Sequence, residues 1–102
     1  MIHRISKYKI REGQADEVRQ AVLEFIRATR ESSPEGVKID VFVEKDGLTF
    51  YHVACFRDEQ TAEAHSASEQ LADIWEAVYE RAESFSQSIE VDLIASTSSG
   101  CQ

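Results

Sequence analysis

Residues 48–56, LTFYHVACF, predict a strand that is apolar on both faces. Side chains alternate along a strand, which puts Phe50, His52, Ala54 and Phe56 on one face and Tyr51, Val53 and Cys55 on the other. Such a strand lies inside its sheet and needs cover on both sides. In a chain of 102 residues, one layer of helices supplies one cover. The second cover must come from another sheet, most simply that of a second subunit.

Three further strands are predicted from apolar residues that alternate with polar ones. They span Ile2–Ile10, Val37–Val43 and Phe85–Ala95. Asp46-Gly47 separates the second of these from residues 48–56 and is typical of a type I′ hairpin turn, in which glycine adopts a positive φ at little cost. In the last strand, one face is expected to carry Phe85, Ile89, Val91 and Leu93.

Helices are predicted where apolar residues recur three and four positions apart. The first begins near Gln14 and ends at Ser32–Gly36, because Pro34 cannot continue a helix. Asp58 is the predicted N-cap of a short helix that ends at His65, and Ser68 is the predicted N-cap of the next helix. The apolar stripes are Ala15, Val18, Val22, Phe25, Ile26 and Thr29 in the first helix, and Leu71, Ile74, Trp75, Val78, Tyr79 and Ala82 in the last.

The resulting order is β-α-β-β-α-β with the second helix split in two, which is the ferredoxin-like α+β arrangement. It predicts a four-stranded antiparallel sheet with helices on one face, formed by residues 1–95. Residues 96–102 form a Ser/Gly-rich tail with nothing to pack.

Charge and motifs exclude several classes of function. The net charge of −8 disfavours nucleic acid and anionic membrane surfaces as partners. No apolar run reaches transmembrane length, and the first residues lack a signal-peptide core. Cys55 and Cys101 form no disulfide framework, so a reduced, cytoplasmic protein is expected. No glycine-rich phosphate loop is present, and the histidines and cysteines lack metal-ligand spacing, so we expect no cofactor and no metal.

Two histidines are candidates for chemistry, and each has a structural alternative. His52 lies among aromatic residues, where it is either a hydrogen-bonded core residue or part of a pocket. His65 either interacts with the end of its helix or takes part in catalysis. We expect both rings to reach a cavity between helices and sheet; the alternative is that His52 faces a partner subunit and His65 faces solvent. Trp75 and Tyr79 lie at core spacing on a helix, which favours packing over stacking on a ligand.

The stretch from Phe50 to Trp75 carries a family resemblance. Its aromatic strand is followed by a short helix that ends in Ala64-His65, then by Ser-Ala-Ser and a second amphipathic helix. In this order the chain resembles the antibiotic biosynthesis monooxygenase (ABM) family of small ferredoxin-like proteins. The likeness covers almost the whole chain and implies that two sheets pack back to back in a homodimeric α+β barrel.

The resemblance also implies an activity. Better-known members of the family oxidise aromatic polyketides or quinols without metal or flavin, so it implies a cofactor-independent monooxygenase that acts on a small aromatic or quinol-like molecule. Such chemistry needs a base and a hydrogen bond to the developing oxyanion, inside an apolar cavity. His52 and His65 are the candidate catalytic residues. The candidate substrate-binding residues of the cavity wall are Phe50, Phe56, Trp75 and Tyr79.

The chain departs from the family pattern at several positions. Ala54 and Phe56 stand where the family often has glutamate and tryptophan, and Gln70 stands where a second histidine is common. These departures favour an alternative function, a non-catalytic ligand-binding or stress-response domain. The haem-degrading branch of the family uses an asparagine, a tryptophan and a histidine at the positions that hold Ser6, His65 and Trp75 here. The sequence therefore argues against haem degradation.

Overall fold

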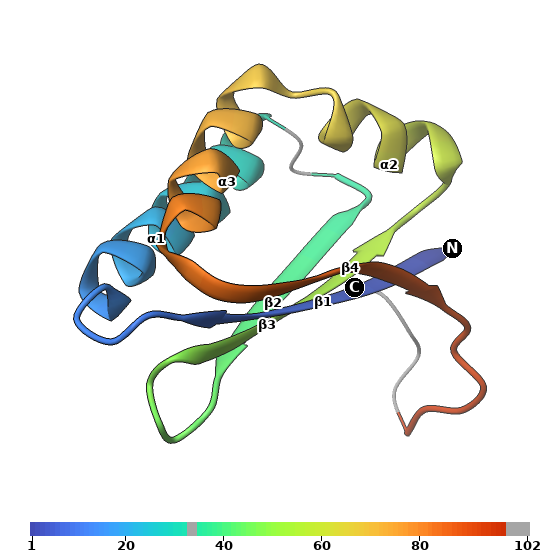
Figure 1. The fold of residues 1–102 in the computed structure, drawn as a ribbon. Helices are drawn as coiled ribbons and strands as arrows, with labels where there is room; N and C mark the ends of the chain where they lie inside the picture. Colours follow the sequence, from blue (N-terminus) through green and yellow to red (C-terminus); the bar gives the residue numbers. More distant parts are fainter. Residues whose placement is uncertain (33–34, 98–102) are drawn as a thin grey trace.

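The computed structural model describes residues 1–32 and 35–97, apart from the side chain of Gln87. All three helices lie on one face of a single antiparallel sheet, and the other face has no helix over it (Figure 1). The elements in chain order are β1 (Ile2–Ile10), α1 (Ala15–Ser32), β2 (Val37–Val43), β3 (Thr49–Phe56), α2 (Glu59–Ser66), α3 (Glu69–Arg81) and β4 (Ala82–Val91).

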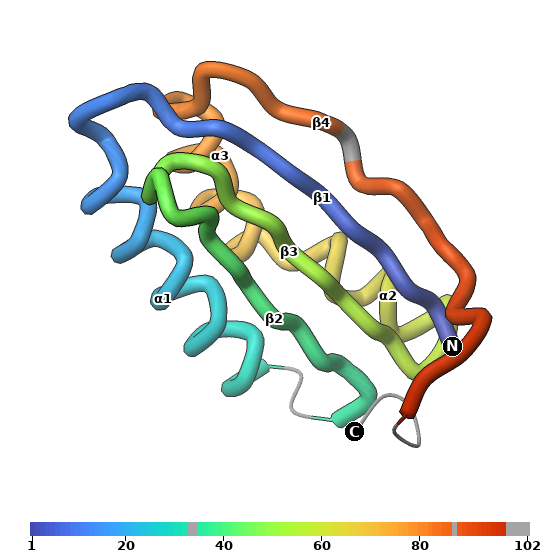
Figure 2. Tube along the Cα trace, turned by 90° about the horizontal axis from the view of Figure 1, so that it is seen from below, coloured from blue at the N-terminus to red at the C-terminus, as the bar shows by residue number. Residues whose placement is uncertain are grey.

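The strand order across the sheet is β2-β3-β1-β4, so β3 and β1 are the two central strands (Figure 2). All three strand pairs are antiparallel. This is the ferredoxin-like α+β fold that the sequence predicts, and the prediction that the apolar strand is central is confirmed.

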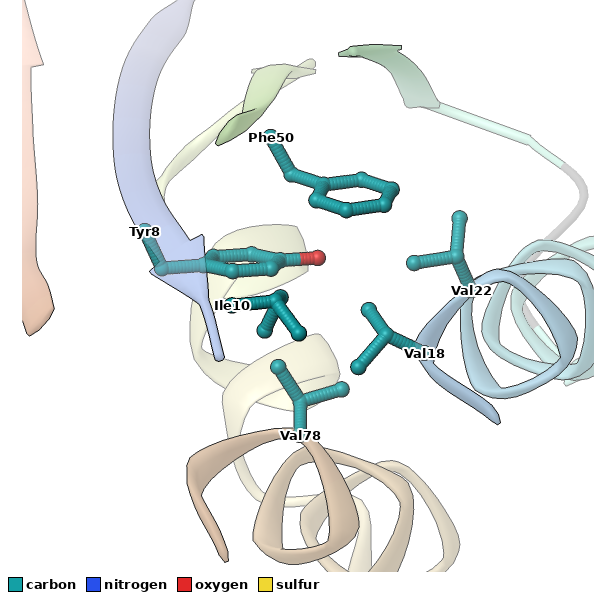
Figure 3. Packing of buried hydrophobic residues seen from close by; sticks show 6 residues of the cluster. All are labelled: Tyr8, Ile10, Val18, Val22, Phe50 and Val78. Carbon is teal, nitrogen blue, oxygen red and sulfur yellow. The ribbon is translucent and has the colours of Figure 1, made fainter. Parts of the chain in front are cut away.

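The main core lies between the sheet and helices α1 and α3. The ring of Tyr8 stacks between those of Phe50 and Phe85, with ring centroids 5.4 Å away in both cases. It extends from β1 toward the two valines of α1, Val18 and Val22 (Figure 3). Burying each of these large apolar side chains stabilises the fold by about 1.5–3 kcal/mol. The buried cluster consists of Tyr8, Ile10, Val18, Val22, Phe50 and Val78.

The predicted start and end of the last strand are wrong. Strand β4 runs from Ala82 to Val91 rather than from Phe85 to Ala95. Val91 pairs with His3, near the beginning of β1, so little of β1 remains for residues 92–95 to pair with, and they lie outside the strand. Leu93 consequently lies outside the sheet and is exposed.

The β2–β3 hairpin forms as predicted, but its turn is not of type I′. A type I′ turn requires positive φ at two central residues, whereas only Gly47 has one here, with φ 75°. The Gly47 N–H donates to the carbonyl of Glu44 at 2.9 Å. The Asp46 carboxylate accepts hydrogen bonds from the N–H groups of Leu48 and Thr49, at 2.8 and 3.1 Å. These hydrogen bonds pair the backbone N–H groups of a loop longer than two residues. The Asp46-Gly47 dipeptide alone does not predict this longer loop.

The predicted N-caps are confirmed. The Asp58 carboxylate accepts a hydrogen bond from the Thr61 N–H at 2.8 Å, and the Ser68 hydroxyl accepts one from the Leu71 N–H at 3.4 Å. Helix α1 ends at Ser32; the residues predicted to break it, Ser33 and Pro34, lie outside the described residues.

Cys55 is disulfide-bonded in the structure, so the prediction of reduced cysteines is wrong. A cysteine count and its spacing do not report on pairing in the fold. The other cysteine, Cys101, and the tail from residue 98 onward lie outside the described residues. A cytoplasmic location, which rested in part on reduced thiols, stays a prediction. Within the described ranges, no helix combines the length and the apolar character needed to cross a membrane.

Candidate functional site

A cavity of about 540 Å³ lies between the sheet and the helices. This volume falls within the range of roughly 300–1,000 Å³ that is usual for small-molecule sites. All four strands line one side, with β2 contributing only Ile39, and α2, α3 and Phe25 of α1 line the other. Among the lining residues are Arg4, His52, Phe56, His65, Trp75 and Tyr79.

The cavity exists because the sheet carries small side chains beneath the helices. Even-numbered residues of β1 and β3 face the helices, and Arg4 pairs with Ala54 and Ser6 with His52 in the register of the two strands. Two residues further along, the Tyr8–Phe50 pair fills the same layer with aromatic rings. Ser6 and Ala54 thus leave a hollow next to a filled core.

His52 lies on the helix-covered side of β3 and is 5% exposed. Its Nε2 is 2.8 Å from the hydroxyl of Tyr8, and its ring lies 4.7 Å from that of Trp75, measured between centroids. Burial lowers the pKa of His52 to about 4, because the charged form loses its hydration. The ring is therefore neutral at pH 7. Its Nδ1 is buried and has no hydrogen-bond partner among the described residues.

His65 lies in the last turn of α2 and is partly buried. Its ring centroid is 5.3 Å from that of Phe56 and 5.7 Å from that of Phe25. The pKa of His65 is lowered by burial first and by the positive charge of Arg4 second. Its Nδ1 is also buried without a hydrogen-bond partner in the described part of the chain. The structure thus brings both predicted histidines to one cavity, as neutral rings.

The four predicted wall residues divide into two groups. Phe56, Trp75 and Tyr79 line the cavity, and Tyr79 is 54% exposed. Trp75 contacts the rings of five neighbours, which are Tyr8, Phe25, His52, Tyr79 and Phe85. Phe50 is absent from the lining: it is 2% exposed and packs in the core against Tyr8. Strand parity places Phe50 on the correct face, but the valines of α1 close the space above it.

Sequence reasoning missed three residues of the site. Phe25 contacts both histidine rings, although the helical stripe predicts only that it is buried. Tyr8 bonds to His52 across 44 positions of sequence. The Arg4 guanidinium lies over the Phe56 ring at 5.8 Å and forms ion pairs with Glu59 and Glu90 at 3.9 and 3.8 Å. Alternation along β1 could have predicted that Arg4 and Tyr8 face the helices. It could not have predicted which residues they contact.

Within residues 1–32 and 35–97, no three His, Cys, Asp or Glu side chains are arranged to hold a metal ion. What the cavity offers is two neutral imidazoles in aromatic surroundings, one of them bonded to the buried hydroxyl of Tyr8. Such a site can bind a flat apolar molecule and exchange a proton with it.

Comparison with known proteins agrees with this geometry. The family model described as antibiotic biosynthesis monooxygenase matches residues 1–77, three quarters of the chain. The chain belongs to the antibiotic biosynthesis monooxygenase family. The match ends within α3 and so includes all the cavity residues discussed above except Tyr79 of α3 and Phe85 of β4. Among curated proteins, none matches this chain.

Several solved structures share the fold of this ABM chain. A crystal structure of an antibiotic biosynthesis monooxygenase superimposes with a TM-score of 0.82 at 18% identity, covering 93% of this chain and 100% of that one. Rv0793 from Mycobacterium tuberculosis superimposes with a TM-score of 0.79 at 16% identity, covering 95% of this chain and 98% of that one. PA3566 from Pseudomonas aeruginosa superimposes with a TM-score of 0.77 at 16% identity, covering 92% of this chain and 94% of that one. At these identities the likeness establishes the fold.

Proposed function

We propose that this ABM-family protein is a cofactor-independent monooxygenase that oxidises a small aromatic or quinol-like molecule with dioxygen. The observation that carries the proposal is the pair of neutral imidazoles, His52 and His65, in one cavity walled by aromatic rings. A neutral imidazole can take a proton from an acidic phenol or enol, and an apolar cavity strengthens each hydrogen bond to the anion that forms.

The reaction balances without any other oxidant. For an activated methylene group, R₂CH₂ and O₂ give R₂C=O and H₂O. A base takes the first C–H or O–H proton, and the anion passes one electron to dioxygen. The resulting radical and superoxide join as a peroxide. The protonated base returns the first proton to the peroxide anion, which becomes a hydroperoxide. Removal of the second C–H proton then breaks the O–O bond and leaves the carbonyl on the substrate and hydroxide, and the hydroxide takes up this second proton as water.

The wall of the cavity suits a flat ring system. Phe25, Phe56 and Trp75 surround the two imidazoles, and Tyr79 lies at an exposed position on the lining. Aromatic rings favour offset or edge-to-face contacts with a bound ring, which adds to the free energy of apolar burial. An electron-rich bicyclic or tricyclic phenol fits both the chemistry and the volume.

The second candidate is a ligand-binding domain without turnover. It is favoured by Ala54 and Phe56, which stand in the cavity where the family often has glutamate and tryptophan. Ala54 leaves no carboxylate beside His52, so this chain lacks an acid–base group at a position where the family often has one. Binding of an aromatic ligand without oxygen consumption would support this candidate instead.

We further propose that two copies pair through the open face of the sheet. That face carries exposed apolar side chains, and Ile5 pairs with Val53 on one side and with Ile89 on the other, which makes a continuous apolar row. These side chains and Phe42 are between 37% and 61% exposed in the single subunit. A second sheet packed on this row would remove them from water, as expected for a strand with two apolar faces.

The direct experiment is oxygen uptake with a panel of quinols and anthrones, with Trp75 fluorescence recorded in parallel. The proposal expects consumption above the spontaneous rate for at least one compound. No uptake across the panel, together with no change in fluorescence, contradicts both candidates; a fluorescence change without uptake supports the ligand-binding domain.

A further inference from the structure

The hydrogen bond between Tyr8 and His52 determines what His52 can offer a ligand. A neutral imidazole carries its hydrogen on one nitrogen and an acceptor lone pair on the other. Nε2 of His52 is 2.8 Å from the Tyr8 hydroxyl, and both side chains are at least 95% buried. The placement of the single ring hydrogen therefore decides which group of this pair donates.

The two tautomers differ in how many buried groups they leave without a partner. With the hydrogen on Nδ1, the Tyr8 hydroxyl donates to Nε2, and among the described residues only the Nδ1–H of this pair lacks an acceptor. With the hydrogen on Nε2, the ring donates to the Tyr8 oxygen. The Tyr8 hydrogen and the Nδ1 lone pair then both lack partners. Each unsatisfied buried polar group is unfavourable, so the first tautomer is favoured.

We propose that Tyr8 fixes His52 as the Nδ1–H tautomer, and that this N–H, which neighbouring side chains enclose here, donates to the carbonyl or phenolate oxygen of a ligand whose binding in the cavity opens the packing around it. His52 is thereby a hydrogen-bond donor to the ligand rather than the base. The ligand class follows: a ring system with an oxygen acceptor, since a pure hydrocarbon leaves the Nδ1–H unsatisfied. Tyr8 is a positioning residue, because it acts through His52.

The role of base then passes to His65. Its Nδ1 is the other buried imidazole nitrogen without a hydrogen-bond partner in the described part of the chain, and it belongs to α2 rather than to the sheet. In this mechanism His52 donates a hydrogen bond to the oxygen on which charge develops, and His65 accepts the proton. This division rests on the proposed function; the tautomer of His52 does not.

The tautomer can be measured without turnover, from the ¹⁵N shifts of the His52 ring in uniformly labelled protein at pH 7. We expect the Nδ1–H form to exceed the Nε2–H form by roughly ten to one or more. In Tyr8→Phe the ring shape is kept and the hydroxyl is lost, so the preference should fall several-fold toward the Nε2–H form that is usual in water. Tyr51→Phe is the matched control, because Tyr51 lies on the opposite face of β3 and bonds to Glu44. It should leave the His52 shifts unchanged.

A second arm tests the ligand contact with two probes of matched shape, 1-tetralone, which has a carbonyl, and tetralin, which has none. We expect 1-tetralone to move the Nδ1–H resonance of His52 and tetralin to leave it in place. A dominant Nε2–H form in the wild type, or no difference between wild type and Tyr8→Phe, overturns the proposal about Tyr8. Equal shifts with both probes, or no shift with either, overturn the ligand contact. Neither result depends on whether oxygen is consumed.

Discussion

The rings of His52 and Trp75 lie with their centroids 4.7 Å apart, one from the central strand β3 and the other from helix α3. Both line the same cavity, so a molecule bound there contacts the sheet and the helices at once. Trp75 is the only tryptophan of the chain. Its fluorescence therefore reports on events next to the candidate site.

Filling the cavity should weaken ligand binding. Ala54 is a half-buried lining residue, and in Ala54→Phe the larger ring would occupy the hollow above Ser6 and His52. We expect the Kd of 1-tetralone, followed by Trp75 fluorescence, to rise at least about tenfold, which corresponds to a loss of about 1.4 kcal/mol.

The control for this variant is Ala64→Phe, because Ala64 is exposed on α2 and does not line the cavity. Its Kd should match that of the wild type. An unchanged Kd in Ala54→Phe would mean that the ligand binds elsewhere on the molecule.

Stability should depend on pH through His52. The pKa of this ring is about 4 in the folded protein and 6.5 when exposed. Above pH 6.5 the ring is neutral in both states and contributes no pH dependence. As the pH falls below 6.5, the unfolded chain binds a proton that the folded protein does not, so stability is lost until about pH 4. Linkage gives a loss of about 2 kcal/mol between pH 7 and pH 5.

The measurement is the free energy of unfolding by urea at pH 7 and pH 5, in wild type and His52→Gln. Glutamine does not titrate and can still bond to Tyr8, so the drop in stability should be smaller by about 2 kcal/mol in the variant. His65 also lowers stability as the pH falls, because its pKa is lowered in the folded protein, but it does so in both the wild type and the variant. Identical pH profiles would show that His52 is protonated as readily as an exposed histidine.

The proposed dimer is tested by placing a charge on the open face of the sheet. Val53 pairs with Ile5 and Asp40 at the centre of that face. Val53→Asp would bury a second carboxylate beside that of Asp40 in the interface and weaken association on the order of a hundredfold or more. Sedimentation at micromolar concentration should show a dimer for the wild type and a monomer for the variant.

Leu23→Asp is the matched control, because Leu23 is an apolar residue on α1 that is 62% exposed. It should sediment as a dimer. A wild-type protein that sediments as a monomer would contradict pairing through the sheet.

His65 should be needed for turnover more than for binding. Loss of a general base typically lowers the rate by about 10²–10⁴. We expect kcat for an anthrone substrate to fall within this range in His65→Gln, with a small change in the Kd of 1-tetralone. Glu63→Gln, an exposed change on the same helix, should keep the wild-type kcat. A kcat in His65→Gln that equals that of the wild type would remove His65 from the mechanism.

The sequence predicts those parts of the site that depend on local pattern. Alternation along β3 places His52, Ala54 and Phe56 on one face, and the Asp58 cap with the following helix places His65 near the end of that strand. These predictions need only strand parity and a capping rule.

The remaining features depend on how distant elements pack. The Tyr8–His52 bond needs the register of β1 against β3, and the contact of Phe25 with both histidines needs the position of α1 over the sheet. The early end of β4 reflects where its partner β1 begins. Phe50 shows the same limit, since its parity is correct but the helix above it closes the cavity. The pattern of residues along one strand or helix does not predict how far apart two distant elements lie.

The most direct test of the central claim measures how much ¹⁸O enters the product when chelator-treated protein oxidises 1,8-dihydroxyanthrone under ¹⁸O₂. The account predicts a product that gains one ¹⁸O atom per molecule, one dioxygen consumed per anthrone, and a rate at least about a hundredfold lower in His65→Gln. Unlabelled product, or labelled product formed no faster than without protein, would contradict it.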